Sequence, residues 1–304
     1  MQISNGHRPT VLLTGAGSGL GLACALHLAS EGANVYGSVL DDREATALGA
    51  AAAARGVVVH AVRLDVTRSD QVTEAVGRVI RERGRIDALV QFAGVGLRGF
   101  FEDLSLEEIR AVFDVNVFGL MAVTQAVLPH MREAGAGRIV IVGSVAGRIG
   151  AMSISGYASS KFAVEGFAEC LAQEVAALGI RVSLVEPGLV STPHFTTNRN
   201  RALRAMDVNS PYYAWFCRHE QIVDDILRRN RITPLDVARV VERILHARRP
   251  RLRYLVGGGA RLVVSLRRYI PGELFERTYF GFIRRLVTSP GRPAVALSSA
   301  TEPK

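Results

Sequence analysis

Short apolar stretches rich in β-branched residues alternate along the chain with longer stretches of helical periodicity. The short stretches predict strands, because they have strand length and are bounded by turn residues. The predicted strands are Thr10–Thr14, Asn34–Val39, Val57–Leu64, Ala88–Phe92, Arg138–Val142, Arg181–Val185 and Arg253–Val256. Strand–helix alternation at this spacing predicts an α/β fold, with a doubly wound parallel sheet of about seven strands and helices on both faces.

Several helix ends are marked by local chemistry. Ser105–Glu108 has the pattern of a capping box and predicts a helix that runs to about Leu128. Thr67, with an acid three residues later, predicts the start of another helix, which Gly84 ends. Thr233 is followed by proline at the first helical position and predicts a third start.

Length and composition favour one large α/β domain or two small ones. The chain has 304 residues, of which 48% are hydrophobic. Its longest apolar stretch, Val115–Leu128, is too short to span a membrane, and Met1–Pro9 lacks the apolar core of a signal peptide. The three cysteines, Cys24, Cys170 and Cys217, lie far apart and have no metal-ligand spacing. We therefore expect a cytoplasmic protein without a metal site.

The net charge of +9 is unevenly distributed. Most of the excess lies between Arg243 and Arg292, whereas the earlier part of the chain is nearly balanced. This disfavours a nucleic-acid-binding role for the whole protein.

A glycine-rich loop, Thr14–Gly21, lies between the first predicted strand and a helix pattern over Leu22–Ser30. Glycines let the backbone approach a pyrophosphate, which is then stabilised by the helix N-terminus. In this context the loop predicts a dinucleotide site formed by Gly15, Ser18, Gly19, Leu20 and Gly21. Asp65, which ends the third strand, is placed to accept from an adenine amino group or to form a helix-capping turn.

Lysine is rare here: the only lysines are Lys161 and Lys304. Lys161 follows Tyr157 by four residues, so the two side chains share one helix face. A compact positive charge favours phenolate and lowers the pKa of a tyrosine from about 10. This would suit Tyr157 to proton exchange. An exposed amphipathic helix can carry the same pair, so the pair alone leaves both interpretations open.

Five motifs in order make the chain resemble the short-chain dehydrogenase/reductase family over about residues 9–257. Thr14–Gly21 fits the family's TGxxxGxG motif. The other four are Asn116 in a helix, Ser144 after the fifth strand, Tyr157 with Lys161, and Pro187-Gly188 followed by Thr192.

The resemblance implies a Rossmann-type fold and hydride transfer between NAD(P) and an alcohol/carbonyl pair. Tyr157 would be the general acid or base, and Lys161 would lower its pKa and bind the nicotinamide ribose. Ser144 would donate to the carbonyl oxygen, and Asn116 would hold a water that links Lys161 to solvent. Further cofactor contacts are implied for Val66, Ala93, Gly94, Pro187, Gly188, Val190 and Thr192.

One motif departs from the family. The usual Asn-Asn-Ala-Gly after the fourth strand is replaced by Gln91-Phe92-Ala93-Gly94. The Ala-Gly half is intact, so the substitution puts the bracing of the central sheet in question more than the chemistry.

The choice between NAD and NADP depends on the end of the second strand. Val39 and Leu40 stand where the family places an acid for NAD or a cation for NADP, and Asp41 and Asp42 follow. With two acids nearby, we expect NAD rather than NADP and assign Asp41 to the cofactor site. Arg43 is the residue that could reverse this preference.

The substrate is expected under a lid over residues 191–232. Its Phe195, Met206, Tyr212, Tyr213, Trp215 and Phe216 indicate either a bulky lipophilic alcohol or ketone or a packed helical subdomain. Lid and C-terminal extension resemble the retinol and 17-beta-hydroxysteroid dehydrogenase branch. Residues 258–287 form a basic amphipathic extension that either touches a membrane surface or presents arginines to solvent, and 288–304 is expected to be a disordered tail.

The resemblance also implies a homodimer or homotetramer, paired through the helix over Ile109–Leu128 and the one near Tyr157. Two alternatives remain at this point. One is a ketoreductase that tailors a polyketide or similar metabolite. The other is a non-enzymatic NAD(P)-sensing protein, which the intact Ser144, Tyr157 and Lys161 disfavour.

Overall fold

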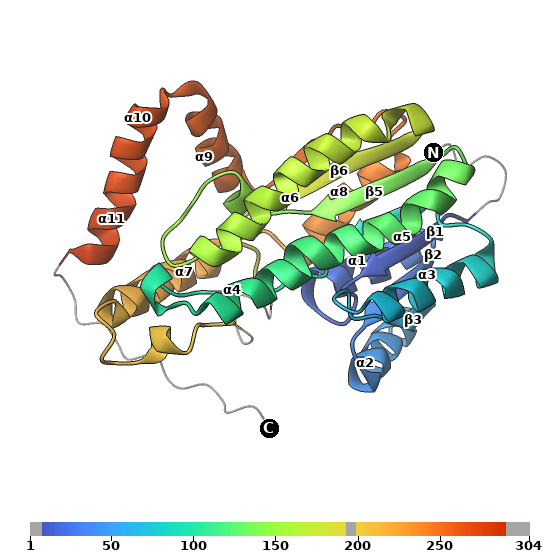
Figure 1. Ribbon diagram of the computed structural model, residues 1–304, viewed down its shortest axis with the longest axis horizontal. Coiled ribbons are helices and arrows are strands. Elements are labelled where there is room, and N and C mark those ends of the chain that lie inside the picture. Colours follow the sequence, from blue (N-terminus) through green and yellow to red (C-terminus); the bar gives the residue numbers. More distant parts are fainter. Residues whose placement is uncertain (1–7, 193–198, 290–304) are drawn as a thin grey trace.

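The centre of the molecule is a parallel sheet of seven strands in the order β3-β2-β1-β4-β5-β6-β7 (Figure 1). The computed structural model describes residues 8–192 and 199–289. The strands are β1 (Thr10–Thr14), β2 (Asn34–Val39), β3 (Val59–Arg63), β4 (Ala88–Gln91), β5 (Gly137–Val142), β6 (Ile180–Pro187) and β7 (Arg253–Val256). The predicted Rossmann-type α/β fold is confirmed. The strand order reverses between β1 and β4, and in such sheets ligands bind beside this point, at the carboxyl ends of the strands.

Four strands differ from their predicted bounds: β4 ends one residue earlier, β5 begins one residue earlier, and β3 and β6 differ by more. Val57 does not belong to β3, because its N–H donates to the Ala52 carbonyl at the end of a helix, 3.1 Å away. At the other end of the sheet β6 is longer than predicted, because Pro187 still pairs with Val256 of β7.

Helices cover both faces of the sheet (Figure 1). They are α1 (Gly19–Ser30), α2 (Asp42–Ala53), α3 (Ser69–Arg83), α4 (Leu106–Phe113), α5 (Leu120–Glu133), α6 (Ser155–Glu174), α7 (Tyr213–Arg229), α8 (Pro234–His246), α9 (Gly258–Tyr269), α10 (Gly272–Phe275) and α11 (Gly281–Thr288). Short 3-10 or π turns are η1 (Phe101–Asp103), η2 (Asp114–Gly119), η3 (Val145–Gly147), η4 (Ala176–Leu178), η6 (Arg204–Met206) and η7 (Glu276–Phe280). One core lies between the sheet and α3, α5 and α6, and the other between the sheet and α1, α2 and α8.

Most of the predicted helix ends are confirmed. Capping boxes at Ser105 and Thr233 begin α4 and α8, and Gly84, with φ 73°, ends α3. The prediction for Thr67 is wrong: α3 begins at Ser69, and the Thr67 hydroxyl donates to Asp65 Oδ1 at 2.7 Å. A threonine oxygen engaged in this turn does not cap the next helix.

The helix predicted from Ser105 to about Leu128 continues to Glu133 and contains the π turn η2. By length and apolar composition, Leu106–Glu133 would be able to cross a membrane. In this fold it is a core helix, because Val117, Val123 and Val127 are buried against the sheet. The π turn changes the helical register in the middle, where it presents Asn116 to the interior.

The C-terminal extension forms a helical hairpin at one end of the molecule (Figure 1). It consists of α9 and of the continuous segment α10–η7–α11, and its Val264 and Phe275 pack against Ile149 in the loop after β5. Of the predicted tail, Thr288 ends α11 as helix, whereas residues 290–304 lie outside the described part of the chain.

Candidate active site

The glycine loop fits a dinucleotide phosphate. A Cβ on Gly15 would lie 2.8 Å from the Ala93 nitrogen, and one on Gly21 would lie 1.9 Å from the Gly15 carbonyl oxygen. Only glycine permits this close approach, which the Ser38 hydroxyl supports by accepting from Gly15 N–H at 2.8 Å. Ser18 precedes α1 without a side-chain cap, and no acid stands in the first turn. The N–H groups and positive dipole end of α1 are thus available to an anion.

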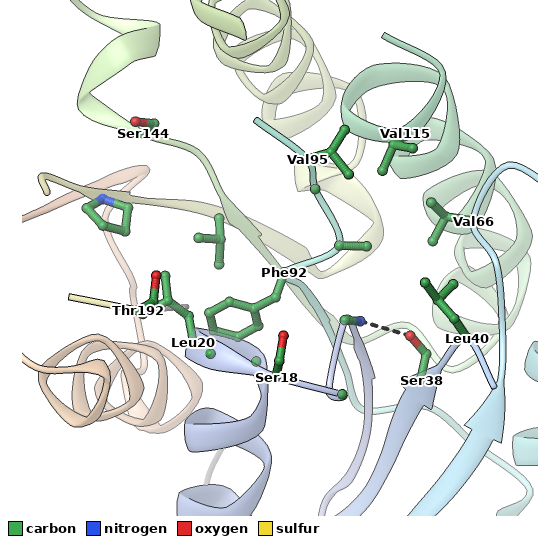
Figure 2. A pocket seen from close by; sticks show the side chains of 18 of the residues that line it. Ser18, Leu20, Ser38, Leu40, Val66, Phe92, Val95, Val115, Ser144 and Thr192 are labelled. Atoms are coloured by element: carbon green, nitrogen blue, oxygen red, sulfur yellow. Dashed lines mark hydrogen bonds between the residues drawn. The ribbon is translucent and has the colours of Figure 1, made fainter. Parts of the chain in front are cut away.

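A cleft of about 440 Å³ extends from this loop along the carboxyl ends of the strands. Ser144 lies at one end of it, and Ser38 and Leu40 lie at the other (Figure 2). The cleft brings together nearly all the predicted cofactor residues: Gly15, Ser18, Gly19, Leu20, Gly21, Asp65, Val66, Ala93, Gly94, Tyr157, Lys161, Pro187, Gly188, Val190 and Thr192.

Asp41 was also predicted to contact the cofactor, but it is not among the described residues that line this cleft. Its carboxylate accepts from Glu44 N–H at 2.8 Å and caps α2, so it is directed to the helix. Glu44, which sequence reasoning missed, lines the cleft instead. Glu44 Oε2 accepts from Leu40 N–H at 2.8 Å, and a Cβ on Gly17 would lie 2.3 Å from that oxygen. The acid at the end of β2 therefore comes from the first turn of the following helix.

The unusual Gln91-Phe92 pair has two separate effects. Gln91 is buried and donates to Thr124 Oγ1 at 2.9 Å, so β4 is tied to α5 by a glutamine–threonine pair. The bracing that the missing asparagines put in question is thus present in another form. The Phe92 ring projects over the start of α1, beside Leu20 (Figure 2). It forms an apolar part of the cleft that the sequence did not predict.

Asp65 forms a local turn with Thr67 that does not cap α3, and its contact with adenine stays a prediction. It lines the cleft, and its Oδ1 accepts from both the N–H and the hydroxyl of Thr67, at 2.9 and 2.7 Å. The turn therefore fixes the carboxyl group at the edge of the cleft.

Tyr157 and Ser144 lie where the cleft meets a second cavity, since both side chains line both spaces. Burial raises the pKa of Tyr157, while the hydrogen bond from Ser144 and the charge of Arg98 act to lower it. The sequence predicted that Lys161 would lower this pKa. Instead the Lys161 Nζ lies 5.8 Å from the centre of the Tyr157 ring and donates to the Val142 carbonyl at 3.2 Å. Burial also lowers the pKa of Lys161, to about 8.

Asn116 connects the loop after β4 to the tyrosine helix. Its side chain accepts from Val95 N–H at 2.8 Å and donates to the Val95 carbonyl at 2.9 Å and to Ser160 Oγ at 3.0 Å. Ser160 in turn donates to the Tyr157 carbonyl at 2.7 Å. Asn116 is fully buried and fixes Tyr157 indirectly. Its water-holding role stays a prediction.

The second cavity has a volume of about 800 Å³ and mostly aliphatic walls. The lid supplies Val223, Ile226 and Ile232 to it, and the extension supplies Val263 and Tyr279. The predicted aromatic residues do not form it. Tyr212 stacks on Phe100 at 5.1 Å between ring centres, and Phe216 is fully buried in a separate small core. The described lid aromatics therefore pack a helical subdomain, as the alternative interpretation held. Phe195 lies outside the described residues.

Two polar clusters hold the lid over this cavity. Arg98 Nε donates to Glu220 Oε1 of α7 at 2.6 Å, and Arg201 Nε donates to Glu220 Oε2 at 3.0 Å. Ser153 Oγ lies 2.7 Å from His219 Nδ1, and Ser153 is the one described non-glycine residue with a positive φ, of 57°. Neither Arg98 nor Ser153 belongs to a recognisable sequence motif, so the sequence did not predict either of them.

Comparison with known proteins agrees with this geometry. The model of the short chain dehydrogenase family matches residues 9–202. The chain belongs to this family. Short-chain dehydrogenases similar to it include retinol dehydrogenase 8 of Bos taurus, 34% identical over 88% of this chain and 88% of that protein. Human 17-beta-hydroxysteroid dehydrogenase type 1 is 35% identical over 81% of this chain and 77% of that protein.

Solved structures show the same likeness. A short-chain dehydrogenase/reductase from Burkholderia phymatum in complex with NAD has a TM-score of 0.75 and 27% identity, over 94% of this chain and 98% of that one. A variant of actinorhodin polyketide ketoreductase with NADPH has a TM-score of 0.73 and 29% identity, over 83% and 97%. The chain is therefore an NAD(P)-dependent oxidoreductase that acts on CH–OH groups.

The residues at the junction of the two spaces have the chemistry this activity needs. NAD(P), when bound in the cleft, supplies or accepts the hydride. Tyr157 Oη can exchange a proton with the substrate oxygen, and Ser144 Oγ can donate to the same oxygen as charge develops on it. The Lys161 ammonium contributes a buried positive charge beside them. The walls of the second cavity beside these two side chains are mostly aliphatic.

Proposed function

We propose that the enzyme transfers hydride between NAD and a bulky, lipophilic secondary alcohol or ketone. One observation carries the proposal: Ser144 and Tyr157 line both the dinucleotide cleft and an aliphatic cavity of about 800 Å³. A cavity of this size suits a drug-sized apolar molecule. The names of the steroid and retinol relatives support the same substrate class.

The test is a substrate panel followed at the reduced-nicotinamide absorbance, with NAD(H) and NADP(H) offered separately. We expect turnover of bulky apolar alcohols or ketones, and loss of about a thousandfold in kcat for Tyr157→Phe. Turnover restricted to polar or carrier-bound ketones would instead favour a tailoring ketoreductase. Cofactor binding without turnover of any compound would favour the sensor.

We attribute the preference for NAD to Glu44. Its carboxylate lies against Gly17 at the end of β2, where it can accept from ribose hydroxyls but would repel a 2′-phosphate. Lys161 is the single cation among the described residues that line the cleft, and Arg43 is not one of them. Glu44→Gln should therefore reduce the NAD over NADP preference by at least about tenfold, or about 1.4 kcal/mol. The control is Asp42→Asn, which removes an exposed acid two residues away. An unchanged ratio of kcat/KM values in Glu44→Gln would refute this assignment.

We also propose a homodimer formed through η2, α5 and α6. Phe118 of η2 and Phe162 of α6 are exposed by 59% and 42%, and these two elements are in contact. Phe118→Glu should give a monomer by light scattering, whereas Val58→Glu, at a site 69% exposed beside β3, should not. A wild-type monomer at micromolar concentration would refute the proposal.

We further propose a cytoplasmic enzyme that binds anionic membrane surfaces through its C-terminal hairpin. Residues 258–289 contain six arginines against two glutamates, and Leu262 and Phe282 are each exposed by 61%. Basic and apolar side chains together suit an anionic lipid interface. The hairpin also walls the cavity, so an apolar substrate could pass directly from the lipid.

The membrane proposal predicts sedimentation with phosphatidylglycerol vesicles and release by salt. Phe282→Glu should weaken this binding, and the Val58→Glu control should not. Equal sedimentation with neutral and anionic vesicles, or none with either, would refute it.

A further inference from the structure

The charged groups around the aliphatic cavity are all of one sign. Among the described residues that line it, Arg98, Arg229 and Arg231 are cations, His219 is the one imidazole, and there is no aspartate or glutamate. A site for a neutral steroid or retinoid has no need of several arginines, because guanidinium groups are specialised for carboxylates and phosphates.

Arg98 is already paired, since its Nε donates at 2.6 Å to the buried Glu220, which also binds Arg199 and Arg201. Arg229 and Arg231 differ from it: both are exposed, and within the described chain no carboxylate pairs with either. The neighbouring Arg228, by contrast, pairs with Asp225 and does not line the cavity. Among the described residues, the lining guanidinium groups without a carboxylate partner therefore lie at the exposed rim of the cavity.

The segment that carries the two arginines is fixed in place. Asn230, between them, donates to the Leu189 carbonyl and accepts from Ile232 N–H. Ile232 lies against Gly257, since a Cβ on that glycine would be 2.5 Å from its side chain. The arginines thus stand beside the start of α9 and close the aliphatic cavity on its outer side. A ligand in this cavity would meet Ser144 and Tyr157, aliphatic walls, and the two exposed guanidinium groups at the rim.

We infer that the substrate is an anionic amphiphile: a hydroxyl or keto group on an apolar body whose far end carries a carboxylate or a phosphate ester, which Arg229 and Arg231 bind. The inference rests on the proposed hydride transfer and narrows its substrate class. A charge-assisted contact at an exposed rim is screened by salt. The preference for the anion must therefore weaken as ionic strength rises.

The test uses three ketones with the same aliphatic chain, which end in a carboxylate, a primary amide or an amine. Wild-type enzyme should have the lowest KM for the carboxylate and the highest for the amine, and only the carboxylate's KM should rise with sodium chloride. Arg229→Gln and Arg231→Gln should each raise the KM for the carboxylate five- to tenfold, with little change in kcat or in the KM for the amide. The control, Arg228→Gln, should leave all three values unchanged.

A second series of ketones has the same chain and ends in a carboxylate, a phosphonate or a phosphate. Their relative KM values then separate the two kinds of anion. Equal KM values for carboxylate and amide in wild type would overturn this inference and leave the proposed function intact. So would rim variants that change the KM for the carboxylate and the KM for the amide by the same factor. Turnover of none of the ketones with either cofactor would overturn the proposed function, and this inference with it.

Discussion

Glu165 offers a quantitative test of the electrostatics beneath the active site. It stands one helical turn after Lys161 and is exposed by only 6%. Its Oε2 accepts from Arg253 Nε at 2.9 Å, and the fully buried Glu186 also faces that Nε, at 3.3 Å. One oxygen of each carboxyl group has no hydrogen-bond partner in the described structure. A proton on Glu165 allows its carboxyl group to hydrogen-bond with Glu186.

Burial, and then the charge of Glu186, raise the pKa of Glu165 from 4.5 to about 7. The folded protein therefore holds a proton that the unfolded chain has lost between these two pH values. The free energy of unfolding must fall as pH rises through this window. Each pKa unit corresponds to about 1.4 kcal/mol, so the full effect is about 3 kcal/mol, of which roughly 2.5 kcal/mol is lost between pH 5 and pH 8.

Glu165→Gln keeps the shape of the side chain and removes this titration. Exchange of the neutral carboxyl group for an amide gives an offset in stability that does not depend on pH, because the amide does not titrate. The free energy of unfolding of the variant minus that of wild type should therefore rise by roughly 2.5 kcal/mol from pH 5 to pH 8. Urea unfolding with linear extrapolation measures both values. Glu169→Gln is the control, because Glu169 binds the same Arg253 but its side chain is exposed by 53%. If the profile of Glu165→Gln runs parallel to that of wild type, Glu165 does not hold this proton.

Two further substitutions test the cleft and the lid. Gly21→Ala would place a methyl group 1.9 Å from the Gly15 carbonyl oxygen and force the loop apart, so the dissociation constant of NADH should rise at least about tenfold, as measured by fluorescence titration. Arg98→Leu leaves the buried Glu220 with less compensation and should lower the unfolding free energy by about 3 kcal/mol in urea. Conversely, unchanged NADH affinity or unchanged stability would contradict the respective argument.

The parts of the site that could be predicted from sequence are those fixed by local backbone geometry. The glycine loop is an example, because a strand, a tight turn and a helix start follow directly from consecutive residues. The i, i+4 relation of Tyr157 and Lys161 is another, since helical periodicity alone places them on one face. In both cases the chemistry and the spacing are carried by one continuous segment.

The other residues of the site could not be assigned, because residue spacing does not encode the direction in which a side chain points. Asp41 and Glu44 are both acids at the start of α2, and only the capping geometry decides that Asp41 turns to the helix while Glu44 turns to the cleft. The lid aromatics show the same limit. Composition suggested a binding surface, but stacking of Tyr212 on Phe100 directs these rings away from the cavity. Arg98 reaches Glu220 across 122 positions, a pairing that only the tertiary fold creates.

Lys161 is a buried lysine in a chain whose cations are nearly all arginines. Two of the 37 basic side chains in the chain are lysines, so a requirement for charge alone would favour arginine here as well. The site, however, is small: Lys161 is exposed by 6%, and a Cβ on Gly94 would lie only 3.8 Å from its Nζ. The planar guanidinium is wider than an ammonium group, and it does not titrate. Burial disfavours the charged form at this position and lowers the pKa of Lys161 to about 8.

Lys161→Arg should therefore keep the positive charge and still lose at least about a hundredfold in kcat/KM, because the guanidinium displaces the groups around Gly94 and Tyr157. The measurement is steady-state turnover beside a thermal unfolding scan. The control, Lys161→Met, keeps the length of the stem without its charge. If arginine restores most of the activity that methionine loses, charge alone is what this position supplies. If both variants fold and both fail equally, the compact shape of the ammonium group is as necessary as its charge, which explains why a chain that uses arginine almost everywhere has lysine at this site.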